Sequence, residues 1–188
     1  MWDLVGARRL AGEQLAELGD RWLHVQTAGR VAEELHASGA VGDIVAVAAW
    51  LHDVGYAPGL HQSGFHPLDG AWFLQRCGAP ADLVALVARH TGAQVEAEER
   101  GLLAPLTSMP AANPNDLDAL TLVDLVSGPR GGPMTPQERL AEIGGRYSAD
   151  SPVGRAVARS GPELLATAQR ARVRLGLPDH WPLPPRQP

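Results

Sequence analysis

The feature that most constrains this fold is a short apolar segment, residues 43–51, with the sequence DIVAVAAWL. A helix of this sequence presents apolar side chains on nearly all of its sides, and such helices are normally buried at the centre of a bundle. We expect a helix over residues 43–54, because Gly55 favours an end there. Its last turn carries His52 and Asp53, so two metal-binding side chains are expected together at a buried helix end.

Helical periodicity also dominates the rest of the chain, whereas the alternating pattern of strands is scarce. The predicted fold class is therefore all-α. The expected helices cover about residues 3–18, 20–38, 43–54, from 67, 80–90, 116–126, from 135, and one or two within 151–175. Loops are expected at 55–66, 104–115 and 128–133, where glycine, proline and asparagine gather.

The C-terminal part of the chain carries three local signals. Thr135 and Glu138 have the spacing of a capping box, which predicts the start of a helix. Gly161-Pro162 predicts an interruption within 151–175. The five prolines from Pro178 onward predict an extended tail. No repeat or linker divides the chain, so we expect one helical domain at 1–177 and a proline-rich tail at 178–188.

Composition narrows the classes of protein that the chain can represent. Its 188 residues, 45% of them hydrophobic, suffice for one domain with a sizeable core. A net charge of −5 argues against nucleic acid as a partner. No apolar stretch reaches about 18 residues, which argues against a membrane partner. The absence of a secretory signal and the single Cys77 predict a cytoplasmic location.

Lysine is absent from the chain, so all 16 Lys and Arg residues are arginine. This bias, together with abundant alanine, glycine and proline, is typical of a GC-rich coding sequence, and we expect a bacterial source. It also has a chemical consequence, because no lysine can act as a base, a phosphate clamp or a Schiff-base amine.

Six histidine and aspartate side chains are candidates for one metal site. A carboxylate in an apolar context, such as Asp124 within LVDLV, is costly unless it is paired or bound to a metal. Each histidine alone has an ordinary explanation: a helix residue, a loop residue, or a cation at a helix C-terminus. Together they favour a metal site built from several helices, with the candidate ligands His24, His52, Asp53, His66, His90 and Asp124.

The chemistry of these donors limits the choice of metal. Imidazole and carboxylate donors suit Fe, Mn, Co, Ni or Zn, with Mg possible. Because neighbouring side chains on a helix diverge, His52 and Asp53 either share one metal beyond the helix end or serve two metals, with Asp53 bridging.

His24, the pair His52-Asp53 and Asp124 resemble the H…HD…D signature of the HD-domain superfamily, over about residues 20–130. Residues 49–56 (AWLHDVGY) resemble the helix that carries the HD pair. Residues 65–71 and 86–90 resemble the segments that supply two further histidines in binuclear members. The resemblance implies an all-helical fold with two divalent metal ions, the first held by His24, His52, Asp53 and Asp124, the second by His66 and His90, with Asp53 bridging.

The same resemblance implies a phosphohydrolase acting on a small phosphorylated molecule or nucleotide by two-metal activation of water, with His52 and Asp53 as catalytic residues. Many cyclic-dinucleotide phosphodiesterases of this superfamily carry Gly-Lys after the HD pair and a Gly-Tyr-Pro signature. Here Gly55 precedes Tyr56 and Gly-Tyr-Pro is missing, so cyclic dinucleotides are not indicated as substrates.

Two alternatives stay open at this point. A di-iron oxygenase cleaving a C–C or C–P bond uses the same ligand pattern, but those enzymes tend to use a lysine near the site, which this chain lacks. A non-catalytic, metal-stabilised binding module is the other alternative, and the complete ligand set argues against it.

Candidate substrate-binding residues follow from their position near the ligands. Arginine can bind phosphate in a bidentate way, which makes Arg21, Arg89 and Arg130 candidates, although each can equally be a solvated surface charge. His61 lies in the loop between Asp53 and His66 and is a further candidate. The substrate, the metal and the oligomeric state are left open by the sequence.

Overall fold

The computed structural model describes residues 2–183, and this range contains helices, turns and one isolated β-bridge between Ser127 and Pro133, but no strand. The all-α prediction is confirmed. The ten α-helices of the described range are α1 (Leu4–Leu15), α2 (Asp20–Ala37), α3 (Asp43–Leu51), α4 (His66–Arg76), α5 (Ala81–Arg89), α6 (Ala93–Arg100), α7 (Leu103–Thr107), α8 (Pro114–Leu125), α9 (Pro136–Arg146) and α10 (Pro152–Arg174). Within the described residues, no helix has the length and apolarity needed to cross a membrane.

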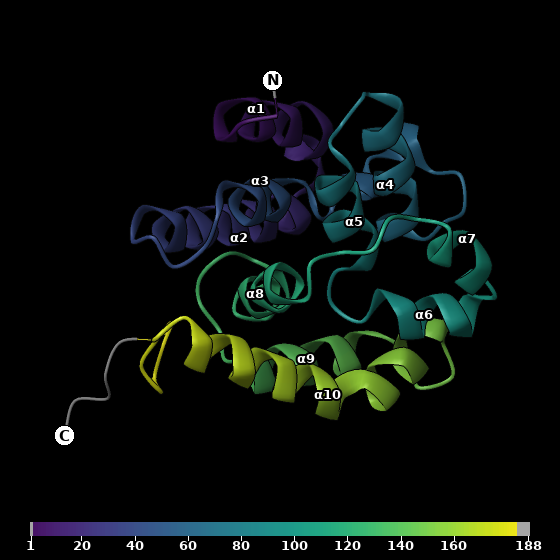
Figure 1. Cartoon of the computed structure of the whole chain (residues 1–188). Helices are drawn as coiled ribbons and strands as arrows, with labels where there is room; N and C mark the ends of the chain where they lie inside the picture. The colour runs from purple at the N-terminus through teal and green to yellow at the C-terminus, as the bar shows by residue number, and fades with distance from the viewer. Residues whose placement is uncertain (1, 184–188) are drawn as a thin grey trace.

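Helix α3 is the central element, as its sequence predicts. It packs against α1, α2, α5 and α8 (Figure 1). All seven residues from Val45 to Leu51 are buried, so the helix has no solvent-facing side. It ends at Leu51, slightly before the predicted end, and a short 3₁₀ turn over Val54–Tyr56 follows. His52 and Asp53 therefore lie between the helix and this turn.

Helix α8 joins two apolar clusters. Leu120 and Val123 belong to the main core, to which α1–α5 also contribute. Leu122 and Leu125 belong to a smaller cluster that α8 forms with α10. Because α8 is covered on both sides, Asp124 is carried into the interior between the two clusters, where it is 8% exposed.

Gly55 allows the chain to pass very close to the start of α4. A Cβ atom at this position would lie 2.0 Å from the carbonyl oxygen of His66 and 2.6 Å from the amide nitrogen of Gly70. Both are backbone atoms, which cannot rotate out of the way. Only glycine therefore allows the Val54–Tyr56 turn and the first turn of α4 to meet, and this meeting places His66 beside Asp53.

Asp69, also in the first turn of α4, holds the loop before this helix. Its fully buried carboxylate accepts hydrogen bonds from the backbone N–H of Ser63 (2.8 Å) and Gly64 (3.1 Å) and from the Ser63 hydroxyl (2.7 Å). The carboxylate thus fixes the chain immediately before His66.

The predicted loop at 104–115 is wrong in its first part, because α7 spans Leu103–Thr107. Pro105 is tolerated there since amides in the first turn of a helix have no partner within the helix. The fully buried side chain of Leu106 fixes this short helix to the core. The predicted capping box of α9 is confirmed: the Glu138 amide donates to the Thr135 hydroxyl oxygen at 3.2 Å.

The predicted interruption at Gly161-Pro162 is also wrong, because α10 continues through Pro162. Packing of α10 against α6, α8 and α9 along its length offsets the backbone hydrogen bond that proline cannot make. The predicted extended tail is wrong for 178–183. These residues turn back, with the Trp181 amide donating to the Pro178 carbonyl at 3.0 Å, and the Trp181 side chain covers the smaller cluster. Residues 184–188 lie outside the described range.

Candidate metal centre

The six donor residues predicted from the sequence come together in the interior. Their positions are His24 in the second turn of α2, His52 and Asp53 directly after α3, His66 at the first position of α4, His90 directly after α5, and Asp124 in the last turn of α8. All are buried except His66, whose side chain is 16% exposed. Helix ends are suited to hold a group of metal-binding side chains, because the chain turns away there and leaves room between them.

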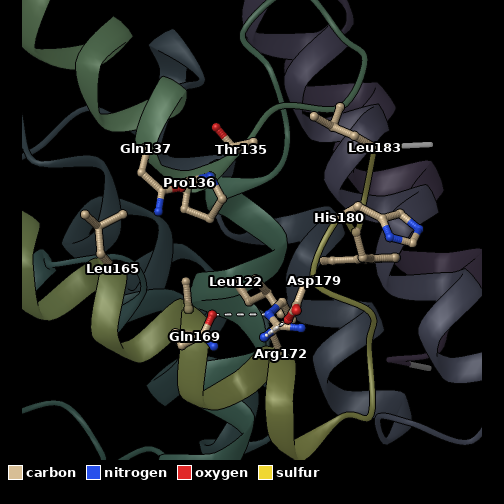
Figure 2. Close-up of a pocket in the computed structure, with 12 residues that line it drawn as sticks. Leu122, Thr135, Pro136, Gln137, Leu165, Gln169, Arg172, Asp179, His180 and Leu183 are labelled. Atoms are coloured by element: carbon tan, nitrogen blue, oxygen red, sulfur yellow. Dashed lines mark hydrogen bonds and ion pairs between the residues drawn. The ribbon is translucent and has the colours of Figure 1, made fainter. Parts of the chain in front are cut away.

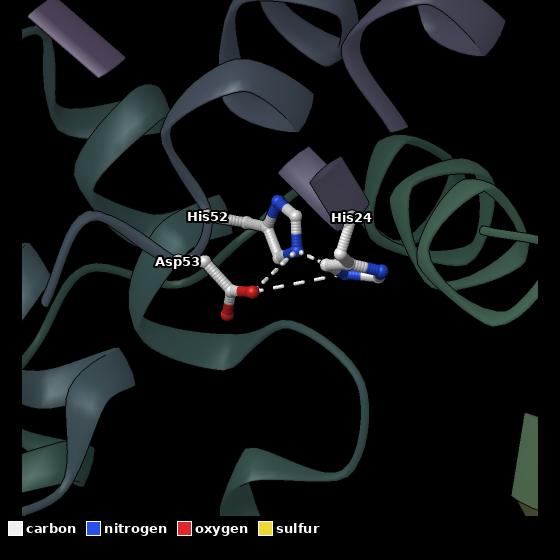
Figure 3. Close-up of side chains that lie close together, drawn as sticks. All are labelled: His24, His52 and Asp53. Atoms are coloured by element: carbon white, nitrogen blue, oxygen red, sulfur yellow. Dashed lines mark hydrogen bonds and ion pairs between the residues drawn. The ribbon is translucent and has the colours of Figure 1, made fainter. Parts of the chain in front are cut away.

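A first group of donors surrounds His24. Its Nε2 lies 3.2 Å from Nε2 of His52, 3.7 Å from Oδ2 of Asp53 and 3.1 Å from Oδ1 of Asp124. Nε2 of His52 lies 3.4 Å from the same Asp53 oxygen. Figure 3 shows the rings of His24 and His52 and the carboxylate of Asp53 pointing toward one another. These distances allow one ion to contact several of the four residues.

A second group shares Asp53 with the first. Nε2 of His66 lies 3.2 Å from Nε2 of His90. Oδ1 of Asp53 lies 3.3 Å from the His66 nitrogen and 3.9 Å from the His90 nitrogen. The two carboxylate oxygens of Asp53 thus face different histidine pairs. Asp53 is the common member of both groups that could hold a metal ion.

Backbone carbonyls fix the orientation of three of the histidine rings. Nδ1 of His24 lies 3.0 Å from the Ser127 carbonyl, that of His52 2.8 Å from the Ala49 carbonyl, and that of His90 2.7 Å from the Val87 carbonyl. A carbonyl only accepts hydrogen bonds, so each Nδ1 carries the proton and donates it. In the neutral rings, each Nε2 therefore presents its lone pair to the centre.

Electrostatics keep the two carboxylates ionised. Burial alone would raise the pKa of Asp53, but the charge of Arg21, followed by the contacts with His52 and His66, outweighs burial and places that pKa well below its ordinary value. For Asp124, burial is likewise outweighed by the contact with His24 and by the nearby His52, and its pKa is also lowered. Both groups therefore offer charged oxygens at neutral pH.

The second histidine pair stays neutral. Burial lowers the pKa of His66 from 6.5 to about 4, although contact with Asp53 acts in the opposite direction. Burial is also the largest cause that lowers the pKa of His90. Neutral imidazoles are the form that binds metals, so this pair is ready to bind a cation at physiological pH.

Arg21, one of the predicted cations, lies within the site. Its Nη1 is 2.5 Å from Oδ2 of Asp53, and its guanidinium carbon is 4.0 Å from the ring centroid of Tyr56. The Tyr56 ring in turn stacks on His66, with centroids 4.0 Å apart and an interplanar angle of 17°. Arg21, Tyr56 and His66 thus form a continuous stack along one side of the donor cluster.

A cavity of about 90 Å³ adjoins the donor cluster. Four of the candidate ligands line it: Asp53, His66, His90 and Asp124. Arg21, Glu96 and, from α9, Arg139 and Arg146 also line it. A second cavity, of about 180 Å³, shares Tyr56 and Tyr147 with the first, and His61 lines it. The cluster is therefore accessible to a small molecule through a region rich in arginine.

A larger cavity, of about 430 Å³, lies elsewhere between α8, α10 and the tail (Figure 2). Arg172 is held there by Gln169, whose Oε1 accepts from Nε at 3.2 Å, and by Asp179 at 2.6 Å. None of the six candidate metal ligands lines this cavity, so its size does not make it the site of metal chemistry.

Of the other predicted substrate-binding residues, one lies at a cavity beside the cluster and two do not. His61 lies at the second cavity, with Nε2 3.2 Å from the Tyr56 carbonyl. The structure does not bring Arg89 to the cavities beside the cluster, since it donates to the carbonyls of Met109 and Pro110 at 2.9 and 2.8 Å. Nor does it bring Arg130 there, because this side chain is 84% exposed. Arg89 stabilises a loop, and Arg130 is a surface charge.

The sequence interpretation missed Thr91, Arg139 and Arg146, which all line the cavity beside the cluster. Arg139, Ile143 and Arg146 recur at the spacing of one helix face, and this is the signal that could have identified them. That signal is weak without knowledge of which face of α9 turns inward.

Comparison with known protein families found no matching family model, and searches of curated proteins and of solved structures found no match either. The chain is an all-α protein in which His24, His52, Asp53, His66 and His90 form a buried cluster that could hold a metal ion.

Proposed function

We propose that this chain is a metal-dependent hydrolase that cleaves the phosphate ester of a small molecule. The observation that carries the proposal is the placement of Asp53. One of its oxygens faces His24 and His52, and the other faces His66 and His90. A carboxylate divided in this way between two sets of nitrogen donors is the arrangement that a pair of neighbouring metal ions needs.

The donors fit such ions chemically. With each Nδ1 proton of His24, His52 and His90 donated to a carbonyl, the atoms that remain at the centre are lone pairs and carboxylate oxygens. Acceptors that face one another repel unless a cation lies among them. Four imidazoles and two carboxylates suit Fe, Mn, Co, Ni or Zn.

His24, His52, Asp53 and Asp124 would hold the first ion, and His66, His90 and Asp53 the second. When bound, two such ions supply a water molecule of lowered pKa and neutralise charge on a phosphoryl group.

The chain's own side chains prepare the site for a phosphate. Arg21, Arg139 and Arg146 line the cavity beside the cluster and can bind an anion that approaches Asp53. Arg21 also orients the Asp53 carboxylate through its 2.5 Å contact. Tyr56 covers one face of His66 and limits the access of bulk water to that ring. These features support hydrolysis of an anionic substrate.

The test is phosphate release from a panel of small phosphomonoesters and nucleotides, with Mn²⁺, Co²⁺, Ni²⁺, Zn²⁺, Fe²⁺ or Mg²⁺ supplied in turn. We expect turnover with at least one pair of metal and substrate. Asp53→Asn should lower it by on the order of 100-fold or more. Asp43→Asn is the matched control, because Asp43 lies at the other end of α3 and is 83% exposed. Equal turnover in Asp53→Asn and the wild type would contradict the proposal.

Other outcomes of the same preparation would replace this function. A visible absorption band from bound iron after aerobic purification, with oxygen consumption on a phosphonate or polyol, would indicate an oxygenase. Metal that raises the melting temperature without turnover on any substrate would indicate a binding module.

A further inference from the structure

Two buried polar atoms stand out beside the metal centre. Among the side chains that the structure describes, Oγ1 of Thr91 and Nε of Arg139 are the buried nitrogen or oxygen atoms without a hydrogen-bond partner. Thr91 follows α5, whereas Arg139 lies on α9, far along the chain. Both residues nevertheless line the cavity of about 90 Å³ next to Asp53 and His66.

Both groups are held in conformations that cost free energy. Thr91 has a φ angle of 33°, in the left-handed region that β-branched residues avoid. Arg139 is 3% exposed, and burying a guanidinium with one N–H unsatisfied is unfavourable. Strained and unsatisfied groups that occur together at a cavity indicate a binding site.

The chemistry of the two atoms defines the missing partner. An arginine Nε–H can only donate, so its partner must be an acceptor, and the threonine hydroxyl can donate to the same partner. On α9, Glu142 accepts from Nη1 of Arg139 at 2.5 Å and from Nη2 of Arg146 at 3.2 Å. One carboxylate thus anchors two guanidinium groups that line the cavity, and Arg21 adds a third. The acidic side chains of the same lining are Glu96 and the candidate metal ligands Asp53 and Asp124.

We propose that Thr91 and Arg139 form an anion subsite that binds the non-bridging oxygens of a substrate's phosphoryl group. The proposal rests on the proposed hydrolase function and names the residues that would bind the phosphoryl group of its substrate. The adjoining cavity of about 180 Å³ receives the organic part, and its size is below the ~300 Å³ at which pockets for drug-sized ligands begin.

The experiment measures the dissociation constant of inorganic phosphate for the metal-loaded protein by calorimetry. We expect Thr91→Val and Arg139→Gln each to weaken phosphate binding about tenfold. Thr91→Ser keeps the hydroxyl and should bind phosphate like the wild type. Arg130→Gln makes the same charge change outside the cavities and should also have no effect. Thr91→Val should melt no earlier than the wild type, because the hydroxyl that it removes has no partner in the protein.

The outcomes separate this inference from the proposed function. Unchanged phosphate affinity in Thr91→Val would overturn the subsite, even if the wild type hydrolyses phosphomonoesters. Loss of bound metal in Thr91→Val would also overturn it, since Thr91 would then act through His90. Weakened phosphate binding with unchanged metal content would support the subsite, even if no ester is hydrolysed. The Thr91→Val variant is sufficient by itself to test the subsite. The test therefore stays decisive even if the Arg139→Gln variant fails to fold.

Discussion

Nε2 of His24 lies 3.2 Å from Nε2 of His52, and each ring donates its Nδ1 proton to a backbone carbonyl. Two neutral imidazoles in this arrangement cannot hydrogen bond to each other, because both present a lone pair. The pair is stabilised by a cation between them, either a proton on one ring or a metal ion that also engages the nearby carboxylates. The carbonyls of Ala49 in α3 and Ser127 after α8 therefore hold the two side chains in a geometry that favours cation binding.

The two donor groups predict that single histidine variants have different effects on metal content. His24 belongs to the first group, and His66 to the second. We expect His66→Gln to lower the bound metal from about two ions per chain to about one, with the first group still occupied, and His24→Gln to remove the other ion. Elemental analysis after dialysis measures the stoichiometry.

His61→Gln is the matched control for these variants, because His61 lines the adjoining cavity but belongs to neither donor group. It should bind metal like the wild type. If His24→Gln and His66→Gln both retain the wild-type stoichiometry, the two-ion assignment is wrong.

The close approach at Gly55 predicts a large effect of one methyl group. Gly55→Ala places a Cβ atom 2.0 Å from the His66 carbonyl oxygen, so the 54–56 turn and α4 must separate. We expect a loss of about 3 kcal/mol or more in the free energy of unfolding, together with weaker metal binding. Denaturant unfolding of the metal-free protein measures the first effect. Gly59→Ala, where a Cβ meets no atom within 4 Å, should stay within about 0.5 kcal/mol of the wild type.

Metal removal should lower the thermal stability of the chain. An ion that binds only the folded state, at a concentration of about 100 times its dissociation constant, adds about 2.7 kcal/mol to the free energy of unfolding. For a chain of this size, that corresponds to a rise in melting temperature of roughly 5–10 °C. We expect Mn²⁺ or Zn²⁺ to produce it and Ca²⁺, which prefers oxygen ligands, to produce much less. A thermal melt with and without chelator is the measurement, and the same shift in Asp53→Asn would argue against binding at this cluster.

The lowered pKa of His66 predicts that acid destabilises the metal-free protein. The pKa of His66 is about 4 in the folded chain and 6.5 as an ordinary value, so the unfolded chain takes up this proton first as the pH falls. Stability is therefore lost as the pH falls from 6.5 toward 4, by up to about 1.4 kcal/mol per pH unit for each such proton. His90, whose pKa is lowered too, acts in the same direction.

The carboxylates of Asp53 and Asp124 add to this loss only at lower pH. Their lowered pKa values stabilise the folded state above the unfolded value near 4, and protonation removes that contribution below it. Unfolding titrations in chelator between pH 7 and pH 4.5 therefore report mainly on the histidines. His66→Gln should reduce the pH dependence in that window, and an unchanged slope would show that His66 is not a buried neutral group.

The sequence was informative where a local pattern determines the structure. The apolar segment at 43–51 predicted a buried helix, and the structure places that helix at the centre. The capping box at Thr135 specified the start of α9 through contacts within four residues. Local patterns failed where packing outweighs them, as in α10, which continues through Pro162 because three helices support it.

By itself, the sequence determined the helical class and the buried central helix and identified six candidate donor residues, because helix periodicity and metal-binding side chains can be recognised without knowing the fold. Only the tertiary structure decided how these residues meet. The approach of Gly55 to α4 brings His66 to Asp53, and the packing of α9 turns Arg139 toward the cavity rather than into solvent. Such contacts join different elements of the fold, and their energies depend on the packing of the whole core.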